Sequence, residues 1–184
     1  MKPHTFVVTV EDQPGVLNRV SSLFRRRNYN IESLTVGHTE RPGVSRMTVV
    51  VRTDDAGAQR IEANLYKLVN VISVSDITST PAVYRDLAMV KVAATQAHRP
   101  EIVHLVEVFR ARIIDLAPDS LTIEITGAEE KIDGLLEVLR PYGVLEMART
   151  GRVAMARGAR VPAQVAAEES LGTTSGDAQV SYSV

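Results

Sequence analysis

The stretch FVVTVEDQPGVLNRVSSLF, residues 6–24, contains a strand, a turn and a helix in immediate succession. Its first half alternates with a period of two, which places Phe6, Val8 and Val10 on one face and is typical of a β-strand. Its second half changes to the helical period, with an apolar stripe at Val16, Leu17, Val20, Leu23 and Phe24. The Pro-Gly pair between the halves indicates a turn. The chain therefore begins with a β-α unit.

The same periodicities along the chain predict the element order β-α-β-β-α-β, followed by a second copy of it. The rest of the first copy consists of two strands, a helix with Asp54 or Asp55 as its N-cap, and a strand, at 30–39, 44–52, 54–70 and 71–78. The second copy is predicted as a strand, helix, two strands, helix and strand at 87–95, 99–110, 111–118, 119–127, 128–143 and 144–155.

This order predicts an α+β fold made of two ferredoxin-like βαββαβ units, each an antiparallel sheet with two helices on one face. We expect the units at residues 1–80 and 81–160, and a flexible tail at 161–184, where Ala, Ser, Thr and Gly dominate without a sustained period. Each sheet is expected to leave one side uncovered and its edges open. Pairing with a second copy of the chain would complete such a sheet.

The composition narrows the possible classes of protein. The net charge is −1, from 21 basic and 22 acidic residues, so no overall field favours nucleic acid or an anionic membrane. The strand segments SRMTVVVR and LTIEITG lack the aromatic side chains with which RNA-binding sheets stack bases. The N-terminus does not resemble a signal peptide, and no apolar run is long enough to span a membrane. We expect a cytoplasmic protein that binds neither nucleic acid nor membrane.

Signatures of catalysis and of metal binding are missing from the sequence. There is no cysteine, no glycine-rich phosphate loop and no GxSxG motif. The four histidines have no metal-ligand spacing. We therefore expect no catalytic residue, no metal site and no cofactor in this chain.

The turn at residues 11–15 is the strongest candidate for a binding site. A helix start offers free backbone N–H groups and a positive dipole, which suit a carboxylate, and Gly15 lets that carboxylate approach the backbone. Pro14 suits the first helical turn, where its missing N–H is not needed. Asp12 is placed to cap the turn or to face an ammonium group. From spacing alone, a plain capped turn and an amino-acid site both remain open.

Longer motifs add a resemblance to a known family. The D-x-P-G-V-L start resembles an ACT domain, a small βαββαβ module that binds amino acids and regulates metabolic enzymes. YNIESLTV, SRMTVVV and KLVNVISVSDIT are similar to the regulatory small subunit of acetohydroxyacid synthase, also called acetolactate synthase. The second unit agrees through LAMVKVAA, FRARIIDLAPDSLTIEITG and ARTGRVAMARG. The resemblance covers about residues 3–158.

The resemblance implies a non-catalytic regulatory subunit of branched-chain amino-acid biosynthesis. Such a chain forms a homodimer through its N-terminal ACT domains, activates a catalytic large subunit and makes it sensitive to valine. Thiamine diphosphate, Mg and FAD are expected in that large subunit. The effector would lie between the helix-start loop of one chain and the strand start of the other, at Asp12, Gly15, Val16, Leu17, Asn30 and Ile31.

The sequence departs from the family at position 12, and one alternative function remains open. Position 12 is Asp where bacterial members of the family often have Asn, which changes the charge of the predicted effector site. The alternative function is a free-standing ACT-type amino-acid sensor that acts on another protein, although no DNA-reading helix-turn-helix is apparent.

Overall fold

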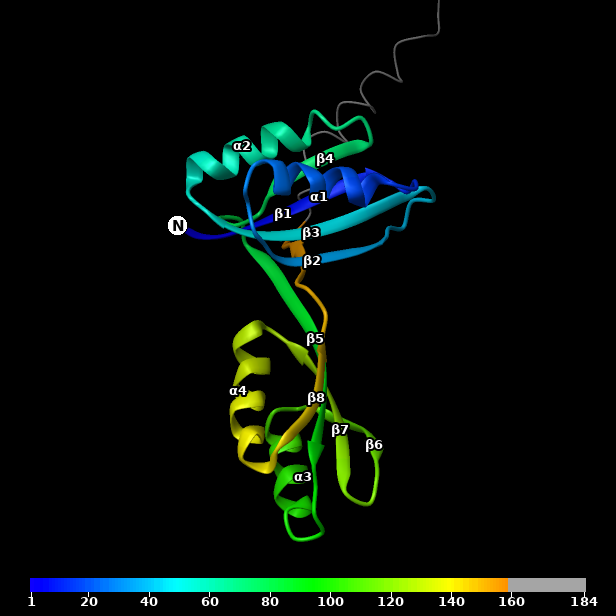
Figure 1. The fold of residues 1–184 in the computed structure, drawn as a ribbon, viewed down its shortest axis with the longest axis vertical. Coiled ribbons are helices and arrows are strands. Elements are labelled where there is room, and N and C mark those ends of the chain that lie inside the picture. Colours follow the sequence, from blue (N-terminus) through cyan, green and yellow to red (C-terminus); the bar gives the residue numbers. More distant parts are fainter. Residues whose placement is uncertain (159–184) are drawn as a thin grey trace, which may run out of the picture.

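A computed structural model describes residues 1–158 of the chain. The predicted tail at 161–184, and the last two residues predicted for the second unit, lie outside the described residues. The described part contains two antiparallel sheets, one above the other in Figure 1, each with two helices on one face. The α+β fold and the repeated βαββαβ order are confirmed. The unit boundary near residue 80 stays a prediction.

The N-terminal sheet has the strand order β2-β3-β1-β4 and carries both of its helices on one side. Its elements are β1 Lys2–Glu11, α1 Val16–Arg26, β2 Ile31–His38, β3 Val44–Thr53, α2 Asp55–Leu65 and β4 Val71–Asp76. The alternation predicted for β1 sets the register, since Phe6 lies opposite Val49 and Val8 opposite Met47. These four side chains are buried in a core with the helix residues Val16, Val20, Phe24, Ala58, Ile61 and Leu65.

The C-terminal sheet repeats this arrangement with the order β6-β7-β5-β8. Its elements are β5 Ala82–Ala93, α3 Arg99–Val108, β6 Arg112–Leu116, β7 Ser120–Gly127, α4 Glu129–Leu139, the short 3-10 helix η1 Arg140–Tyr142 and β8 Val144–Arg149. The face toward α3 and α4 is a second apolar core, formed by Ala88, Val90, Val92, Leu121, Ile123 and Ile125 with Ile102, Val106, Ile132, Leu135 and Leu139.

Helices α1 and α2 begin in different ways: α2 has a side-chain cap and α1 does not. Asp54, one of the two predicted candidates, is the N-cap of α2, and its carboxylate accepts a hydrogen bond of 2.6 Å from the N–H of Gly57. The prediction that Pro14 lies in the first helical turn is wrong, because α1 begins at Val16. Gly15 before it has a φ of 85°, a left-handed conformation that cannot continue a right-handed helix.

The last predicted strand, at 144–155, is in fact two strands. β8 ends at Arg149, and a separate strand, β9 Val153–Ala156, follows after three residues. β9 pairs antiparallel with the first residues of β5, from Ala82 opposite Ala156 to Arg85 opposite Val153. The long strand β5 therefore pairs with β9 at its start and with β7 and β8 farther along.

The expectation that each sheet has an uncovered side is wrong for the N-terminal sheet. The chain that follows β8 crosses the face opposite α1 and α2, as Figure 1 shows in orange below the sheet. Ala154 is buried there against Val7 and Ile77. Arg46 donates a hydrogen bond of 2.7 Å to the Ala154 carbonyl. Apolar packing and a charged hydrogen bond from Arg46 thus help to hold this segment on the sheet.

Gly151 allows the crossing chain to lie directly on strand β2. A Cβ at this position would be 2.6 Å from Thr35 Oγ1 and 2.7 Å from the Leu34 carbonyl oxygen. Both distances are shorter than any ordinary contact of a methyl group, and one of the two atoms belongs to the backbone. Any larger residue at position 151 must push the segment away from the sheet.

We predict that Gly151→Ala destabilises the protein by about 1–3 kcal/mol, the usual cost of overpacking. This would lower Tm by roughly 2–10 °C for a chain of this size, as measured by differential scanning calorimetry. The matched control is Gly37→Ala on β2, the strand against which Gly151 lies. An added Cβ at Gly37 meets nothing within 4 Å. Equal Tm values for the two variants would contradict the close approach of Gly151 to β2.

Candidate functional site

The loop between β1 and α1 forms the core of the predicted effector site. It is held by the N–H of Asp12, which donates to the Gly43 carbonyl at 2.8 Å, and by the N–H of Gln13, which donates to the Glu11 carbonyl at 3.0 Å. Gly15 is the N-cap of α1 but provides no side-chain hydrogen bond to the helix. The loop therefore presents the helix start without blocking it.

The first turn of α1 carries a local positive charge. Within residues 1–158, the N–H groups of Leu17 and Asn18 have no acceptor, and the first turn has no acidic residue. Arg25 and Arg26 lie in the last turn, where cations complement the negative end of the helix dipole. An anion at the N-terminus would satisfy the free donors and the positive end of the dipole together.

Asp12 does not cap the helix. Its Oδ2 lies 3.2 Å from Nδ1 of His38, the last residue of β2, and both side chains are substantially exposed. The loop carboxylate is thus turned toward the outer end of β2. His38 is a neighbour of the predicted site that the sequence analysis missed, because only the antiparallel path of β2 and β3 brings it back to the loop.

The two apolar residues of the loop have different positions. Val16 is buried in the N-terminal core, so its side chain is unavailable to a ligand on the surface. Leu17 is 44% exposed although it is a large aliphatic side chain. Of the pair, only Leu17 can offer an apolar surface beside the helix start.

Asn30 and Ile31 lie at the opposite end of β2 from Asp12. β2 has eight residues, so at a rise of about 3.3 Å each the two ends are roughly 25 Å apart. Asn30 and Ile31 instead line a shallow hollow of about 400 Å³ at the other end of α1, with Phe24 and Tyr29. Within one chain, the six predicted residues therefore form two separate groups.

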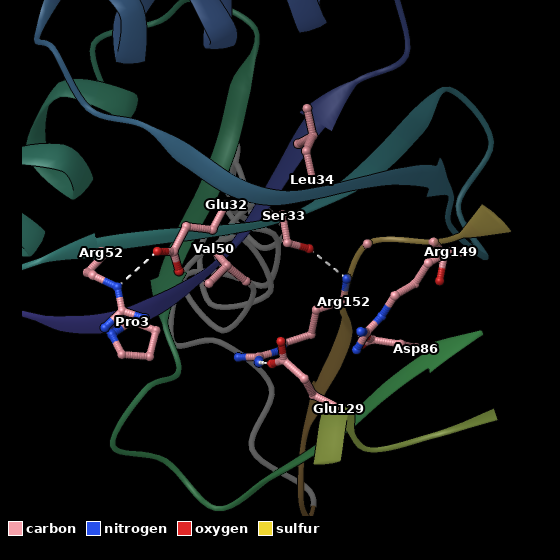
Figure 2. Close-up of a pocket in the computed structure, with 12 residues that line it drawn as sticks. Pro3, Glu32, Ser33, Leu34, Val50, Arg52, Asp86, Glu129, Arg149 and Arg152 are labelled. Atoms are coloured by element: carbon pink, nitrogen blue, oxygen red, sulfur yellow. Dashed lines mark hydrogen bonds and ion pairs between the residues drawn. The ribbon is translucent and has the colours of Figure 1, made fainter. Parts of the chain in front are cut away.

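A cleft of about 430 Å³ lies between the N-terminal sheet and the start of α4 (Figure 2). Its charged side chains are paired: Arg52 with Glu32 at 2.9 Å, Arg149 with Asp86 at 2.8 Å, and Arg152 with Glu129 at 2.7 Å. These pairs neutralise the cleft, so its charge favours no particular ligand. This cluster could not be predicted from the sequence, since the arginines near residue 150 form no motif that identifies their partners.

Arg149 remains charged in this setting. Burial lowers the pKa of Arg149, but hydrogen bonds and the charges of Asp86 and Asp133 outweigh that effect, so the pKa lies above its ordinary value. The NH1 group of Arg149 is 2.8 Å from Asp133 on α4. This arginine fastens the end of β8 to β5 and α4 within the C-terminal unit.

The described part of the chain contains neither a cluster of metal ligands nor a membrane-spanning helix. Among residues 1–158, no group of three or more His, Asp or Glu side chains is placed to hold a metal ion. No helix in the same range is long and apolar enough to cross a membrane.

Comparisons with known proteins agree with the fold and with the motifs. Residues 6–73 match the family model of the AHAS small subunit-like ACT domain, and residues 85–158 match the model of the small subunit of acetolactate synthase. The chain is 49% identical over 157 residues to the acetolactate synthase small subunit of Mycolicibacterium smegmatis, covering 85% of this chain and 92% of that one. It is 46% identical over 152 residues to that of Bacillus subtilis, covering 82% and 88%.

A solved structure provides the same comparison in three dimensions. The crystal structure of the small subunit of acetolactate synthase from Thermotoga maritima superposes with a TM-score of 0.81 at 40% identity, covering 87% of this chain and all of that one. The two family models together span most of the described residues. The chain therefore belongs to the family of acetolactate synthase small subunits, the non-catalytic regulatory subunits of that enzyme.

Proposed function

We propose that this chain forms a homodimer through its N-terminal ACT domains and binds valine, or a related branched-chain amino acid, between the two chains. In this proposal it activates a catalytic large subunit in the cytoplasm and confers feedback inhibition by valine. Thiamine diphosphate, Mg and FAD belong to the large subunit, and this chain holds no cofactor. The proposal rests above all on the open N-terminus of α1 at Gly15.

The free donors of α1 suit the carboxylate of an amino acid. The N–H groups of Leu17 and Asn18 lack acceptors among the described residues, and the left-handed Gly15 adds no side chain that would block access. The exposed Leu17 offers an apolar contact beside them. The carboxylate and the aliphatic side chain of an amino acid could therefore both be bound within the first turn of α1.

The outer edge of β2 suits pairing with a second copy. β2 ends the strand order β2-β3-β1-β4, so one side of its backbone has no neighbouring strand in that sheet. A two-fold axis at the middle of β2 would pair two β2 strands antiparallel. The start of one β2 would then lie beside the end of the other, which places the partner's Asn30 and Ile31 near the loop at Asp12.

This arrangement would reunite the two groups of predicted residues. The partner's Asn30 and the carboxylate of Asp12 would bind the ammonium group, while Leu17 and the partner's Ile31 would enclose the branched side chain. Val16 would contribute through its position in the main chain, because its side chain is buried. An Asp at position 12 favours the ammonium over the carboxylate as its partner, on charge alone.

A site shared by two chains couples ligand binding to quaternary arrangement. If valine binds more tightly to one arrangement of the dimer, it shifts the population of chains toward that arrangement. The catalytic subunit binds the same dimer, so this shift changes its activity. A coupling free energy thus links the valine site to the catalytic subunit. Regulation by this route needs no catalytic residue in the regulatory chain.

The proposed function is tested with the purified chain and its catalytic subunit. We expect the chain alone to form no acetolactate from pyruvate, to raise the activity of the catalytic subunit severalfold, and to make that activity sensitive to valine. Acetolactate formation with and without the chain, at increasing valine concentration, measures all three effects. Turnover by the chain alone, or no change in the catalytic subunit's activity, would refute the proposal.

We predict that Gly15→Asp abolishes the valine response. The added carboxylate would occupy the helix start and repel the ligand carboxylate, at a folding cost of about 1 kcal/mol, because Asp tolerates a left-handed conformation better than most residues. Isothermal titration calorimetry should show no valine binding, while the dimer persists. The control is Gly158→Asp, which has a φ of 77° and equally open surroundings outside the loop; equal valine affinity in both variants would refute the site.

We further predict that Val36→Asp dissociates the dimer. Val36 lies on β2 and is 42% exposed in the single chain, so the folded chain tolerates the charge, whereas strand pairing would bury it without a partner. Light scattering coupled to size exclusion should show a monomer that has lost valine binding. The control is Val69→Asp, at a valine that is 90% exposed. A dimer with normal valine affinity in the Val36 variant would refute the β2 interface.

A further inference from the structure

Two arginines three residues apart bind the same face of helix α4. Arg149 contacts Asp133 at 2.8 Å, and Arg152 contacts Glu129 at 2.7 Å. Asp133 follows Glu129 by four residues, so the two carboxylates lie one helical turn apart on one side of α4. The chain between β8 and β9 is thereby tied to the first turns of this helix, as Figure 2 shows for Arg152 and Glu129.

Arg152, unlike Arg149, also binds the N-terminal sheet. Its main-chain N–H donates to Ser33 Oγ at 2.7 Å, and its NH1 group lies 3.3 Å from Thr5 Oγ1. The guanidinium also lies over the Tyr84 ring, 5.3 Å from the centroid. The side chain is only 20% exposed, so water screens these contacts weakly. One residue thus joins β1, β2, β5 and α4.

Ser33 lies close to the half of the proposed effector site that β2 carries. It follows Ile31 by two residues, and the pairing of β2 with β3 shifts register between Ile31 and Ser33. Such a bulge breaks the regular ladder, so this part of β2 is held less firmly by its neighbour. A displacement at Ile31 therefore reaches Ser33 directly, and with it the main chain of Arg152.

We propose that Arg152 transmits effector binding from strand β2 of the ACT domain to helix α4 of the C-terminal domain. Movement of Ser33 shifts the Arg152 main chain, Gly151 lies against β2 beside it, and the guanidinium carries the shift to Glu129. Arg152 is a positioning residue, since it touches neither of the two groups of predicted ligand contacts. The inference rests on the proposed function, because it assigns the route by which bound valine acts.

Removal of Arg152 should separate the binding of valine from the effect of valine on activity. In Arg152→Ala, we expect the valine Kd from calorimetry to stay within about twofold of the unmodified dimer, because the effector site is intact. Activation of the catalytic subunit without valine should also be retained. The coupling factor is the factor by which saturating valine lowers the activity of the complex. We expect this factor to be roughly fivefold or more smaller in Arg152→Ala than in the unmodified complex.

Three variants accompany this one. Arg152→Lys should restore part of the coupling, because an ammonium can reach Glu129 but lacks the planar fork that contacts Glu129 and Thr5 together. Glu129→Gln removes the acceptor charge at a half-exposed position and should lower coupling in the same direction. Arg52→Ala is the matched control, an arginine of the same cleft whose partner Glu32 belongs to the same sheet; it should leave coupling unchanged.

A distance measurement tests the link without catalysis. The chain has no cysteine, so labels can be placed at Lys67→Cys and Glu137→Cys, two exposed positions, one in each unit. Electron-electron resonance on labelled chains diluted into unlabelled ones reports the distance between the units. We expect Arg152→Ala to broaden this distribution in the absence of valine, and valine to shift it only in chains that retain Arg152.

The outcomes are distinct. Full valine inhibition in a folded Arg152→Ala dimer, or coupling lost equally in Arg52→Ala, would overturn the role of Arg152. If Arg152→Ala fails to fold, unchanged coupling in Glu129→Gln would overturn it as well. If the unmodified chain binds no valine, the proposed function fails and this inference fails with it. Normal valine binding with normal coupling in every variant overturns only the route through Arg152.

Discussion

The contact of residues 151–154 with the second face of the N-terminal sheet is the constraint on which the described architecture depends. A four-stranded sheet with helices on one side leaves an apolar surface on the other, and here Val7 and Ile77 are covered by Ala154 of the same chain. The covering segment comes from the far end of the second unit. The two similar units therefore pack through the first residues of β5 and the returning strand β9, which pair with each other and lie against Val7 and Ile77.

The elements built on local pattern were predictable from sequence. Alternation in β1 and the apolar stripe of α1 depend only on which residues face one core, so the period is visible without knowledge of the partner strands. Asp54 as the cap of α2 follows from chemistry within three residues. The position of Pro14 was predicted wrongly because the left-handed turn at Gly15, rather than proline preference, decides where α1 begins.

The contacts between the units could not be predicted from local sequence patterns. β9 follows β8 after three residues with no strong turn signal, and its pairing with Ala82–Arg85 depends on the path of the whole second unit. Arg152 finds Ser33 and Glu129 across 119 and 23 residues of sequence. The predicted site residues came from a family resemblance. The placement of Asp12 beside His38, and of Val16 inside the core, required the three-dimensional arrangement of β2 and α1.

The separation of Asp12 and Asn30 by the length of β2 has a thermodynamic consequence for the proposed dimer. A dilute, dissociated chain would possess two half-sites and no complete one, so apparent affinity for the effector would depend on protein concentration. By mass action, the effector would in turn favour association, because it binds the paired state and not the separate chains. A metabolite bound in this way acts as a cross-link whose strength follows its own abundance.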